Sequence, residues 1–239
     1  MLLTLSKSLE CFAGQQRCKQ LFGYLLLRSL SSGKPAKPFS LLDEPKYTTP
    51  SFFRLFFTQS KILAYRWQFD ADFAVEEFVR GSKQALGAIS SRLASFNVDG
   101  LRNLVSHELL TRLKDCLGRL QESERKLLNM SDHNVTFGFI HNCSYTGALV
   151  NSEPTYYFNI MMVFHCLQKI DDMKRFHESL EGKSAEEIHK KILELSLKPG
   201  ELPDFLTDQM IVNMGFRRQL LPNPDSEWTV NELNYFQPG

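Results

Sequence analysis

The chain has 239 residues, of which 43% are hydrophobic and 23% charged, with five cysteines, 13 glycines and 10 prolines. This allows one large core or two small ones, and it excludes a disordered tail, a disulfide-framework miniprotein and a collagenous chain. The net charge of +1 is unevenly distributed: residues 1–40 hold six basic residues and one acid, which leaves residues 41–239 with 22 basic and 26 acidic residues. A mildly acidic body argues against nucleic-acid binding by phosphate neutralisation, so we expect no DNA partner.

The first 30 residues have the features of a mitochondrial transit peptide. The segment is basic and Ser-rich, and four apolar residues fall on one helical face: Leu2, Leu5, Leu9 and Phe12. Arg28 lies three residues before Ser31, which is a spacing typical of matrix processing sites. We therefore expect a transit peptide over residues 1–30 and location in the mitochondrial matrix. The alternative is a secretory signal with residues 21–27 as its core, but seven apolar residues are few for that role.

Residues 31–50 are expected to form an extended linker. Four prolines stand there among Gly, Ser and Lys: Pro35, Pro38, Pro45 and Pro50. The longest apolar stretch of the body, residues 156–167, has 12 residues and is interrupted by Asn159 and His165. A bilayer needs about 20 apolar residues, so we expect a protein that is soluble or peripheral to the membrane.

The folded part is expected from residue 51 and starts with a basic amphipathic helix over residues 52–67. Between Lys46 and Phe69 there are four basic residues and no acid. Arg54 and Lys61 lie seven residues apart, hence on one side, which suits anionic lipid or an acidic partner. The predicted contact residues are Phe52, Phe53, Arg54, Phe56, Lys61 and Trp67. The alternative is that the aromatic residues pack on the body's own sheet while the basic side chains point outward.

Two further long helices and a short one are expected before residue 134. Asp70 or Asp72 suits the N-cap of the second helix, because a carboxylate accepts hydrogen bonds from free backbone N–H groups. Its expected buried side consists of Ala74, Phe78, Ala85, Ile89, Leu93 and Phe96. Leucines at helical spacing predict a third helix over 99–120, and a short polar helix is expected over 123–128.

From residue 134 the apolar period changes from 3.6 to 2, which is typical of strands. We expect turns at Gly147 and at residues 151–154, and a turn at 222–225 between the last two strands. The later strands are expected over residues 156–170, 209–221 and 228–236, and residues 184–198 are expected to form a helical turn that runs into a strand. Helices first and antiparallel strands second predict an α+β fold, with the helices packed on one face of the sheet.

The sequence carries few signs of catalytic or metal chemistry. His141 and Cys143 lie two apart on a strand, so they are expected to face the same way and to be able to join His165 or Cys166 around zinc. No CxxC or HxxxH spacing supports such a site, and Cys and His in strands are usually core residues. No nucleophile elbow, Walker loop or dinucleotide fingerprint occurs. We therefore expect no metal, no cofactor and no enzyme. An active site in a cavity, the enzymatic alternative, needs convergent polar groups there.

Short patches at the two ends of the body resemble the Tim-forty-four-like domain family. The patches are residues 65–67, 70–73, 76–78, 81–85 and 224–230. Over residues 51–239, the resemblance implies a cone-like domain in which a curved antiparallel sheet and its helices enclose an apolar pocket. It also implies a peripheral position on the inner membrane and non-catalytic handling of inner-membrane proteins.

The nearest branch of that family implies a more particular role. Its members are associated with the m-AAA protease, with inner-membrane protein precursors and with maturation of a regulatory subunit of the calcium uniporter. Members further away include a mitoribosomal protein and an inner-membrane ribosome receptor. The resemblance therefore implies a matrix adaptor for the protease, with a mitoribosome-associated insertion factor as the alternative.

Overall fold

The computed structural model describes residues 39–50, 52–150, 153–168, 209–222 and 226–237. These residues all belong to one compact unit, Lys37–Arg175 with Asp204–Gly239. The transit peptide expected over residues 1–30, the segment 184–198 and most of the turn at 222–225 lie outside the described residues.

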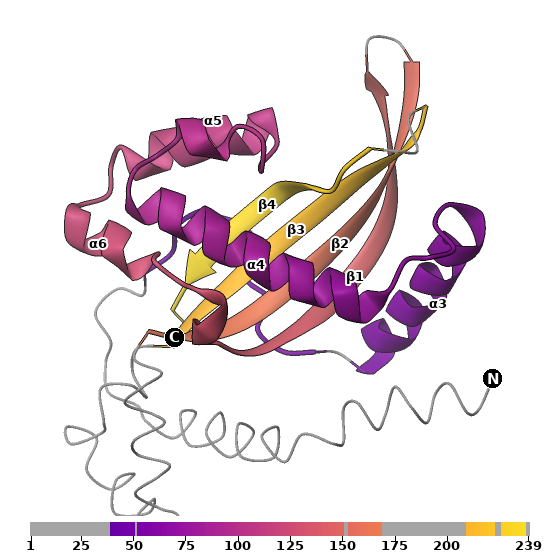
Figure 1. The fold of residues 1–239 in the computed structure, drawn as a ribbon, viewed down its shortest axis with the longest axis horizontal. Helices are drawn as coiled ribbons and strands as arrows, with labels where there is room; N and C mark the ends of the chain where they lie inside the picture. The colour runs from indigo at the N-terminus through magenta and orange to yellow at the C-terminus, as the bar shows by residue number, and fades with distance from the viewer. Residues whose placement is uncertain (1–38, 51, 151–152, 169–208, 223–225, 238–239) are drawn as a thin grey trace, which may run out of the picture. The chain divides into compact units, whose positions relative to one another are not determined.

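Helices precede strands along the described chain, as the sequence predicts (Figure 1). The helical elements are α3 (Phe52–Gln68), α4 (Val75–Ala94), the 3-10 turn η1 (Asp99–Leu101), α5 (His107–Leu117), α6 (Glu122–Leu127) and the 3-10 turn η2 (Asp132–Asn134). The strands are β1 (Val135–Val150), β2 (Glu153–Leu167), β3 (Gln209–Leu221) and β4 (Thr229–Phe236). The α+β class is confirmed, and the predicted bounds of the first helix and of β3 agree with the structure to within a residue.

The four strands form one antiparallel sheet in the order β1-β2-β3-β4. Strand β2 pairs with strands on both sides and is apolar on both faces, as its sequence predicts. On one face, Phe158, Ile160 and Met162 join the main core, while Val163 joins a second, smaller cluster. Helix α4 crosses the main-core face of the sheet in Figure 1. A sheet buried on both faces needs cover on each, and the described helices supply it on only one.

The second helix places its core residues close to the prediction. Ile89 and Leu93 are fully buried as expected, and Leu86 is buried one position after the predicted Ala85. Phe96 is 45% exposed, because the chain leaves the helix at Ser95 and takes a positive φ of 57° at Phe96.

The prediction that Asp70 or Asp72 is the N-cap of the second helix is wrong. Helix α4 begins at Val75 after an N-cap, Ala74, that makes no side-chain capping bond. The Asp70 carboxylate instead lies 2.6 Å from the guanidinium of Arg218 on β3. Asp70 is thus occupied by a partner distant in sequence, which the local helix-start signal does not reveal.

The predicted third helix is interrupted, which corrects the expectation of one helix over 99–120. The N–H of Ser106 donates to the carbonyl of Val230 at 2.7 Å, and the N–H of Val230 donates to the carbonyl of Leu104 at 3.0 Å. These bonds pair the chain with β4 and replace helical ones. The Ser106 hydroxyl then caps α5 by accepting from the N–H of Leu109.

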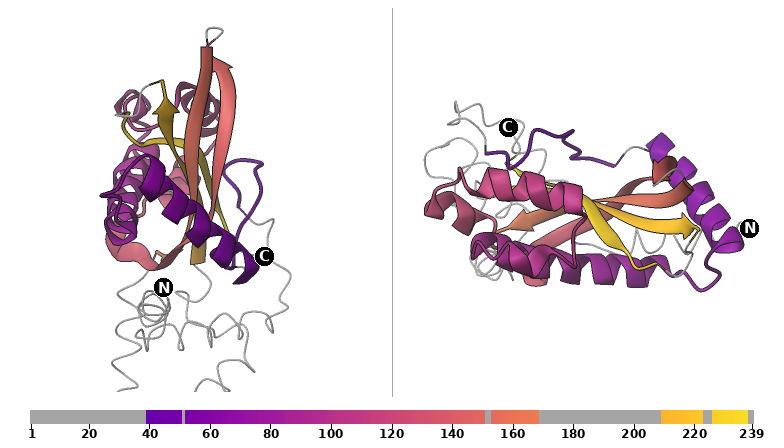
Figure 2. Two further views of the ribbon diagram at one scale, coloured as in Figure 1. Left: turned by 90° about the vertical axis from the view of Figure 1, so that its right-hand side faces the viewer. Right: turned by 90° about the horizontal axis from the view of Figure 1, so that it is seen from above.

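Residues 39–50, here called the strap, pack on the sheet instead of standing free as a linker. Leu41 and Leu42 are buried in the main core, and the N–H of Leu41 donates to the carbonyl of Tyr235 on β4 at 2.8 Å. At the other end, the Thr48 carbonyl contacts His165 on β2. Tyr47 packs against the small cluster of Phe139, Val163, Ile211 and Phe236. The part of the strap around Tyr47 and Thr48 therefore covers the sheet face opposite α4 (Figure 2), while Leu41 and Leu42 belong to the main core.

Strand β1 continues through Gly147 to Val150, so the turn predicted at Gly147 is wrong. The pairing of β1 with β2 extends from Val135 opposite Cys166 to Val150 opposite Glu153. A bulge interrupts it between Ile140 and Asn142. Gly147 pairs with Tyr156 inside this ladder, and the hairpin reverses only after Val150.

Replacing a buried strap residue tests whether the strap belongs to the fold. Leu41→Ala is expected to lower the free energy of unfolding by about 2–5 kcal/mol, because it leaves a cavity in the main core. Leu149→Ala is the matched control, since Leu149 is 77% exposed and its truncation should cost less than about 0.5 kcal/mol. Urea unfolding measures both, and equal stabilities for the two variants would show that the strap is dispensable.

Candidate interaction surface on helix α3

Helix α3 has an inner face that is buried against the sheet. Thr58, Ile62 and Tyr65 recur at steps of four and three and are all at most 3% exposed. The ring of Tyr65 stacks on Phe158 of β2 with centroids 4.3 Å apart and an interplanar angle of 10°. Phe73, which follows the helix, meets the same tyrosine edge-on at 5.2 Å. This face contributes to the core and fixes the rotation of the helix about its axis.

A polar cluster at the carboxyl end of α3 fixes the same helix to β3. The guanidinium of Arg218 donates to the Tyr65 hydroxyl at 2.9 Å and to the Asp70 carboxylate at 2.6 Å. Burial raises the pKa of Tyr65 to about 12, so the phenol stays neutral and accepts the bond from Arg218. A buried tyrosine ring whose hydroxyl is also hydrogen-bonded fixes the orientation of α3 more specifically than apolar contact alone.

The two basic residues predicted as contacts point onto β1. The guanidinium of Arg54 lies 2.9 Å from Nε2 of His141, and Nζ of Lys61 donates to the carbonyl of Cys143 at 2.9 Å. The hydroxyl of Tyr145 returns a bond to the carbonyl of Lys61. Arg54 and Lys61 are both exposed to solvent, and at the same time these bonds hold α3 along the edge of the sheet. Whether they also contact a partner stays a prediction.

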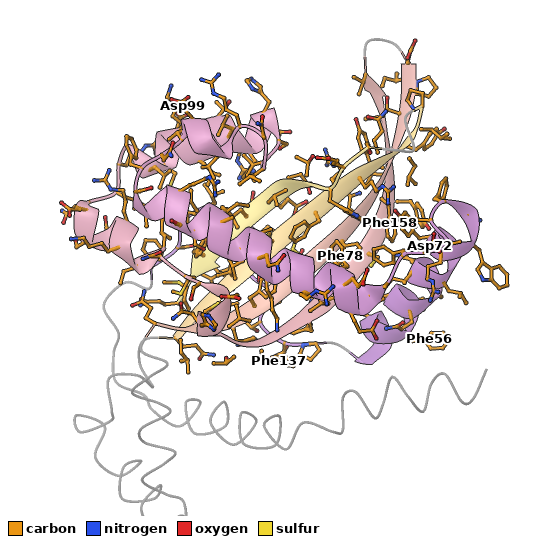
Figure 3. The ribbon with its side chains drawn as sticks, viewed as in Figure 1. Phe56, Asp72, Phe78, Asp99, Phe137 and Phe158 are labelled. Atoms are coloured by element: carbon orange, nitrogen blue, oxygen red, sulfur yellow. The ribbon has the colours of Figure 1, made fainter. Side chains whose placement is uncertain are left out.

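The opposite side of α3 is an exposed apolar surface, here called the outer aromatic face. Its members and exposed fractions are Phe56 (70%), Phe57 (61%), Leu63 (51%) and Trp67 (83%). Steps of seven and four place Phe56, Leu63 and Trp67 along one line of the helix. Figure 3 shows Phe56 on the side of α3 turned away from the sheet and Phe158 on the sheet itself. The side chains of Phe52 and Phe53 lie outside the described ones.

The described aromatic residues of the outer aromatic face point to solvent and not to the sheet. Phe56 and Trp67, predicted as contacts, point to solvent, so the alternative in which they pack on the body's own sheet is not observed. Contiguous exposed aromatic side chains usually mark a surface that a partner or membrane covers. Arg66 lies in the last turn, and α3 contains no acidic residue. The outer aromatic face therefore suits an apolar partner surface with neutral or acidic surroundings.

The β-bulge separates the two residues considered as zinc ligands. The bulge inserts one extra residue between Ile140 and Asn142 and reverses the alternation of side chains beyond it. His141 stacks on Tyr47 of the strap at 4.2 Å, whereas Cys143 is buried in the main core. The prediction that both face the same way is thus wrong. Among the described residues, no group of three or more His, Cys, Asp or Glu side chains is placed to hold a metal.

Two histidines are buried in states that favour the neutral imidazole. Burial and the neighbouring Arg54 lower the pKa of His141, whose Nε2 accepts from that guanidinium. Burial likewise lowers the pKa of His165. His165 donates from Nε2 to the carbonyl of Thr48 at 2.8 Å and accepts at Nδ1 from Gln209 at 3.1 Å. Both histidines hold elements of the fold together and are not arranged around a common reaction centre.

A groove of about 720 Å³ lies between the strap and α5. Charged residues of both signs line it, among them Lys46, Arg119 and Asp115, and the thiol of Cys116 donates to the carbonyl of Leu41 at 2.8 Å. This groove is open to solvent, unlike the enclosed pocket implied by the family resemblance. Beneath α4, fully buried side chains such as Leu86 and Ile89 belong to the same packed core as the sheet.

The described residues thus define a class of α+β domain in which helices cover one face of an antiparallel meander and one helix keeps an exposed aromatic side. No family model matches the chain. The chain is similar to the m-AAA protease-interacting protein 1, mitochondrial, of rat (Rattus norvegicus), mouse (Mus musculus) and human (Homo sapiens). In each case 23% of 167 residues are identical, which covers 70% of this chain and 52% of the relative. The chain therefore spans about half the length of these relatives.

The similarity is distant, and the relatives are mitochondrial by name. In the part of the chain that the structure describes, no helix is long and apolar enough to cross a membrane.

The buried histidines predict a loss of stability in acid. The pKa of His165 is lower in the folded than in the unfolded chain, so the unfolded chain binds the proton first as the pH falls. The free energy of unfolding should therefore decrease below about pH 6.5, by up to about 1.4 kcal/mol per pH unit from this residue. His165→Gln should flatten that decrease, and His133→Gln, at an exposed position, should not. Urea unfolding from pH 8 to 5 measures this, and parallel curves for the two variants would contradict the assignment.

Proposed function

We propose that this chain is a non-enzymatic mitochondrial adaptor that binds the m-AAA protease through the outer aromatic face of α3. The observation that carries the proposal is the exposure of Phe56, Phe57, Leu63 and Trp67 on a helix that is otherwise firmly packed. The relatives support the choice of partner, because their names describe proteins that interact with this protease. The family resemblance of residues 65–85 and 224–230 supports the same reading.

The packing of α3 suits it to bind a protein surface. Tyr65 fixes the inner face of the helix, and Arg54 and Lys61 fix its flank on β1. The aromatic side chains therefore stand on a helix that does not need to be ordered at the moment of binding, which lowers the entropic cost of association. Exposed aromatic residues on a rigid support are also the side chains that most often dominate the binding energy of an interface.

The proposed location is the matrix, peripheral to the inner membrane. The basic, Ser-rich segment over residues 1–30 supports import, and the absence of acidic residues from α3 allows its approach to anionic lipid headgroups. In this setting the adaptor assists the sorting and maturation of inner-membrane protein precursors, for which the family resemblance suggests a regulatory subunit of the calcium uniporter. The Tim-forty-four-like fold is part of the same proposal.

Removing the aromatic residues one at a time tests the proposed contact. In the full chain, Phe56→Gln and Trp67→Gln are each expected to lower recovery of the m-AAA protease by about tenfold on affinity purification from mitochondria, since an aromatic hot spot contributes at least about 1.4 kcal/mol. Phe96→Asn is the matched control: it removes an exposed aromatic residue away from α3 and suits the positive φ there.

Thermal unfolding checks that each variant keeps the stability of the parent chain. Unchanged recovery of the protease with both α3 variants would contradict the proposed contact. Recovery of the large mitoribosomal subunit in place of the protease would favour the alternative function, an insertion factor associated with the mitoribosome.

A further inference from the structure

The end of the β1–β2 hairpin extends beyond the described helices, and no other described segment covers the outer edge of β1 there. Figure 2, left, shows the hairpin rising past α3. All six residues from Tyr145 to Val150 are exposed, and Leu149 is the most exposed of the large apolar ones at 77%. Helix α3 reaches along β1 only as far as its contacts with Cys143 and Tyr145.

The backbone groups on this edge alternate in direction. The carbonyl of Ser144 accepts from the side chain of Asn159, its partner on β2, so the backbone of Ser144 faces inward. The carbonyl of Cys143 accepts from Lys61 of α3, so the backbone of Cys143 faces outward. The pairing with β2 continues without a bulge from Asn142 to Val150. The N–H and C=O groups of Tyr145, Gly147 and Leu149 therefore also point outward. The described residues hold no backbone partner for them.

The other outer edge of the sheet is protected. Ser40 of the strap pairs with Phe236 near one end of β4, and Val105 pairs with Val230 near the other. Natural sheets usually protect long edges with such cover, or with charged residues and proline. Beyond the reach of α3, the described residues give the β1 edge no such cover. The edge also lacks charge and proline, because no Asp, Glu, Lys or Arg stands between Asp132 and Glu153, and no proline stands between Pro50 and Pro154.

We propose that the outer edge of β1 from Tyr145 to Val150 binds an extended, uncharged, apolar segment of another polypeptide as an added strand. Outward N–H and C=O groups at every second residue are complementary only to a second extended backbone. On one face of the sheet the side chains of Tyr145 and Leu149 flank the added strand, and on the other face those of Ala148 and Val150 do so. Because these side chains are uncharged and mostly apolar, an apolar segment is complementary to them. This site goes beyond the proposed function, since it lies on a surface separate from the outer aromatic face and does not require the protease.

A second copy of this chain fits the edge less well than a flexible segment. Six residues of strand offer a pairing length of about 20 Å. Two rigid copies joined along this edge alone would bury far less than the roughly 1,200 Å² of a stable interface. A short extended segment, in contrast, can follow the edge and also wrap onto the exposed side chains of Tyr156 and Leu221 beside it.

The probe for the experiment is a short fluorescent peptide of alternating Val and Thr, added to the full chain. Its expected signature is slower hydrogen exchange at the amides of Tyr145, Gly147 and Leu149 only, because the amides of Thr146 and Ala148 are already bonded to β2. The same peptide with N-methyl groups on alternate residues has lost the donors for pairing and is expected not to bind. Protection elsewhere, or binding of the methylated peptide, would overturn the proposal.

Two substitutions at one position provide the matched variants. Gly147→Pro removes an outward N–H and should weaken peptide binding at least about tenfold. Gly147→Ala keeps that N–H, and its added methyl group would meet the Tyr156 ring at 3.4 Å, an ordinary contact, so binding should persist. Equal affinities of the two variants would overturn the proposal. If Gly147→Pro does not fold, the hydrogen-exchange pattern of the parent chain with the peptide supports or overturns the proposal by itself.

Two further measurements separate this site from its alternatives. Trp67→Gln should bind the peptide as the parent chain does, whatever its effect on the protease, and loss of binding would assign the peptide to α3. Sedimentation of the parent chain without peptide should show no pairing through the hairpin, whereas a dimer that Gly147→Pro abolishes would assign the edge to a second copy.

Discussion

The packing of Tyr65 between α3 and the sheet determines what this molecule presents to its surroundings. One fully buried ring stacks on Phe158 of β2, and its hydroxyl accepts a hydrogen bond from Arg218, which also donates to Asp70. Because the helix cannot rotate without breaking this arrangement, the opposite side of α3 must face outward, and with it Phe56 and Trp67. The exposure of aromatic residues is thus a consequence of a satisfied core on the other side of the same helix.

The sheet depends on cover from two different sources. Helix α4 lies on one face, and the later part of the strap, which comes from a segment rich in proline, lies on the other through Tyr47. Isolated bridges from Ser40 and Val105 also protect the β4 edge, whereas the described residues cover β1 only along its first part. The exposed features therefore gather at α3 and at the adjoining hairpin, and these are the two surfaces to which we assign partners.

Sequence patterns predicted the features that depend on near neighbours. The helical spacing of the aromatic residues located α3, the change to a period of 2 located the start of β1, and the apolar run of β2 predicted its central position. Features set by distant partners were missed: Val105 pairs with β4 and breaks a helix that leucine spacing predicts, although Ser106 is a recognisable N-cap. For the candidate site, periodicity separated the two sides of α3 but did not show that Arg54 and Lys61 turn to β1. The bulge that separates His141 from Cys143 has no signal in the period either.

The central claim is that the outer aromatic face of α3 is the surface by which the chain meets the m-AAA protease. The most direct measurement replaces Trp67 with a photo-crosslinking phenylalanine analogue in the full chain, irradiates intact mitochondria and identifies the crosslinked peptides by mass spectrometry. The account predicts crosslinks from position 67 to subunits of the protease. Crosslinks from this position only to the chain's own residues, or only to ribosomal proteins, would contradict it.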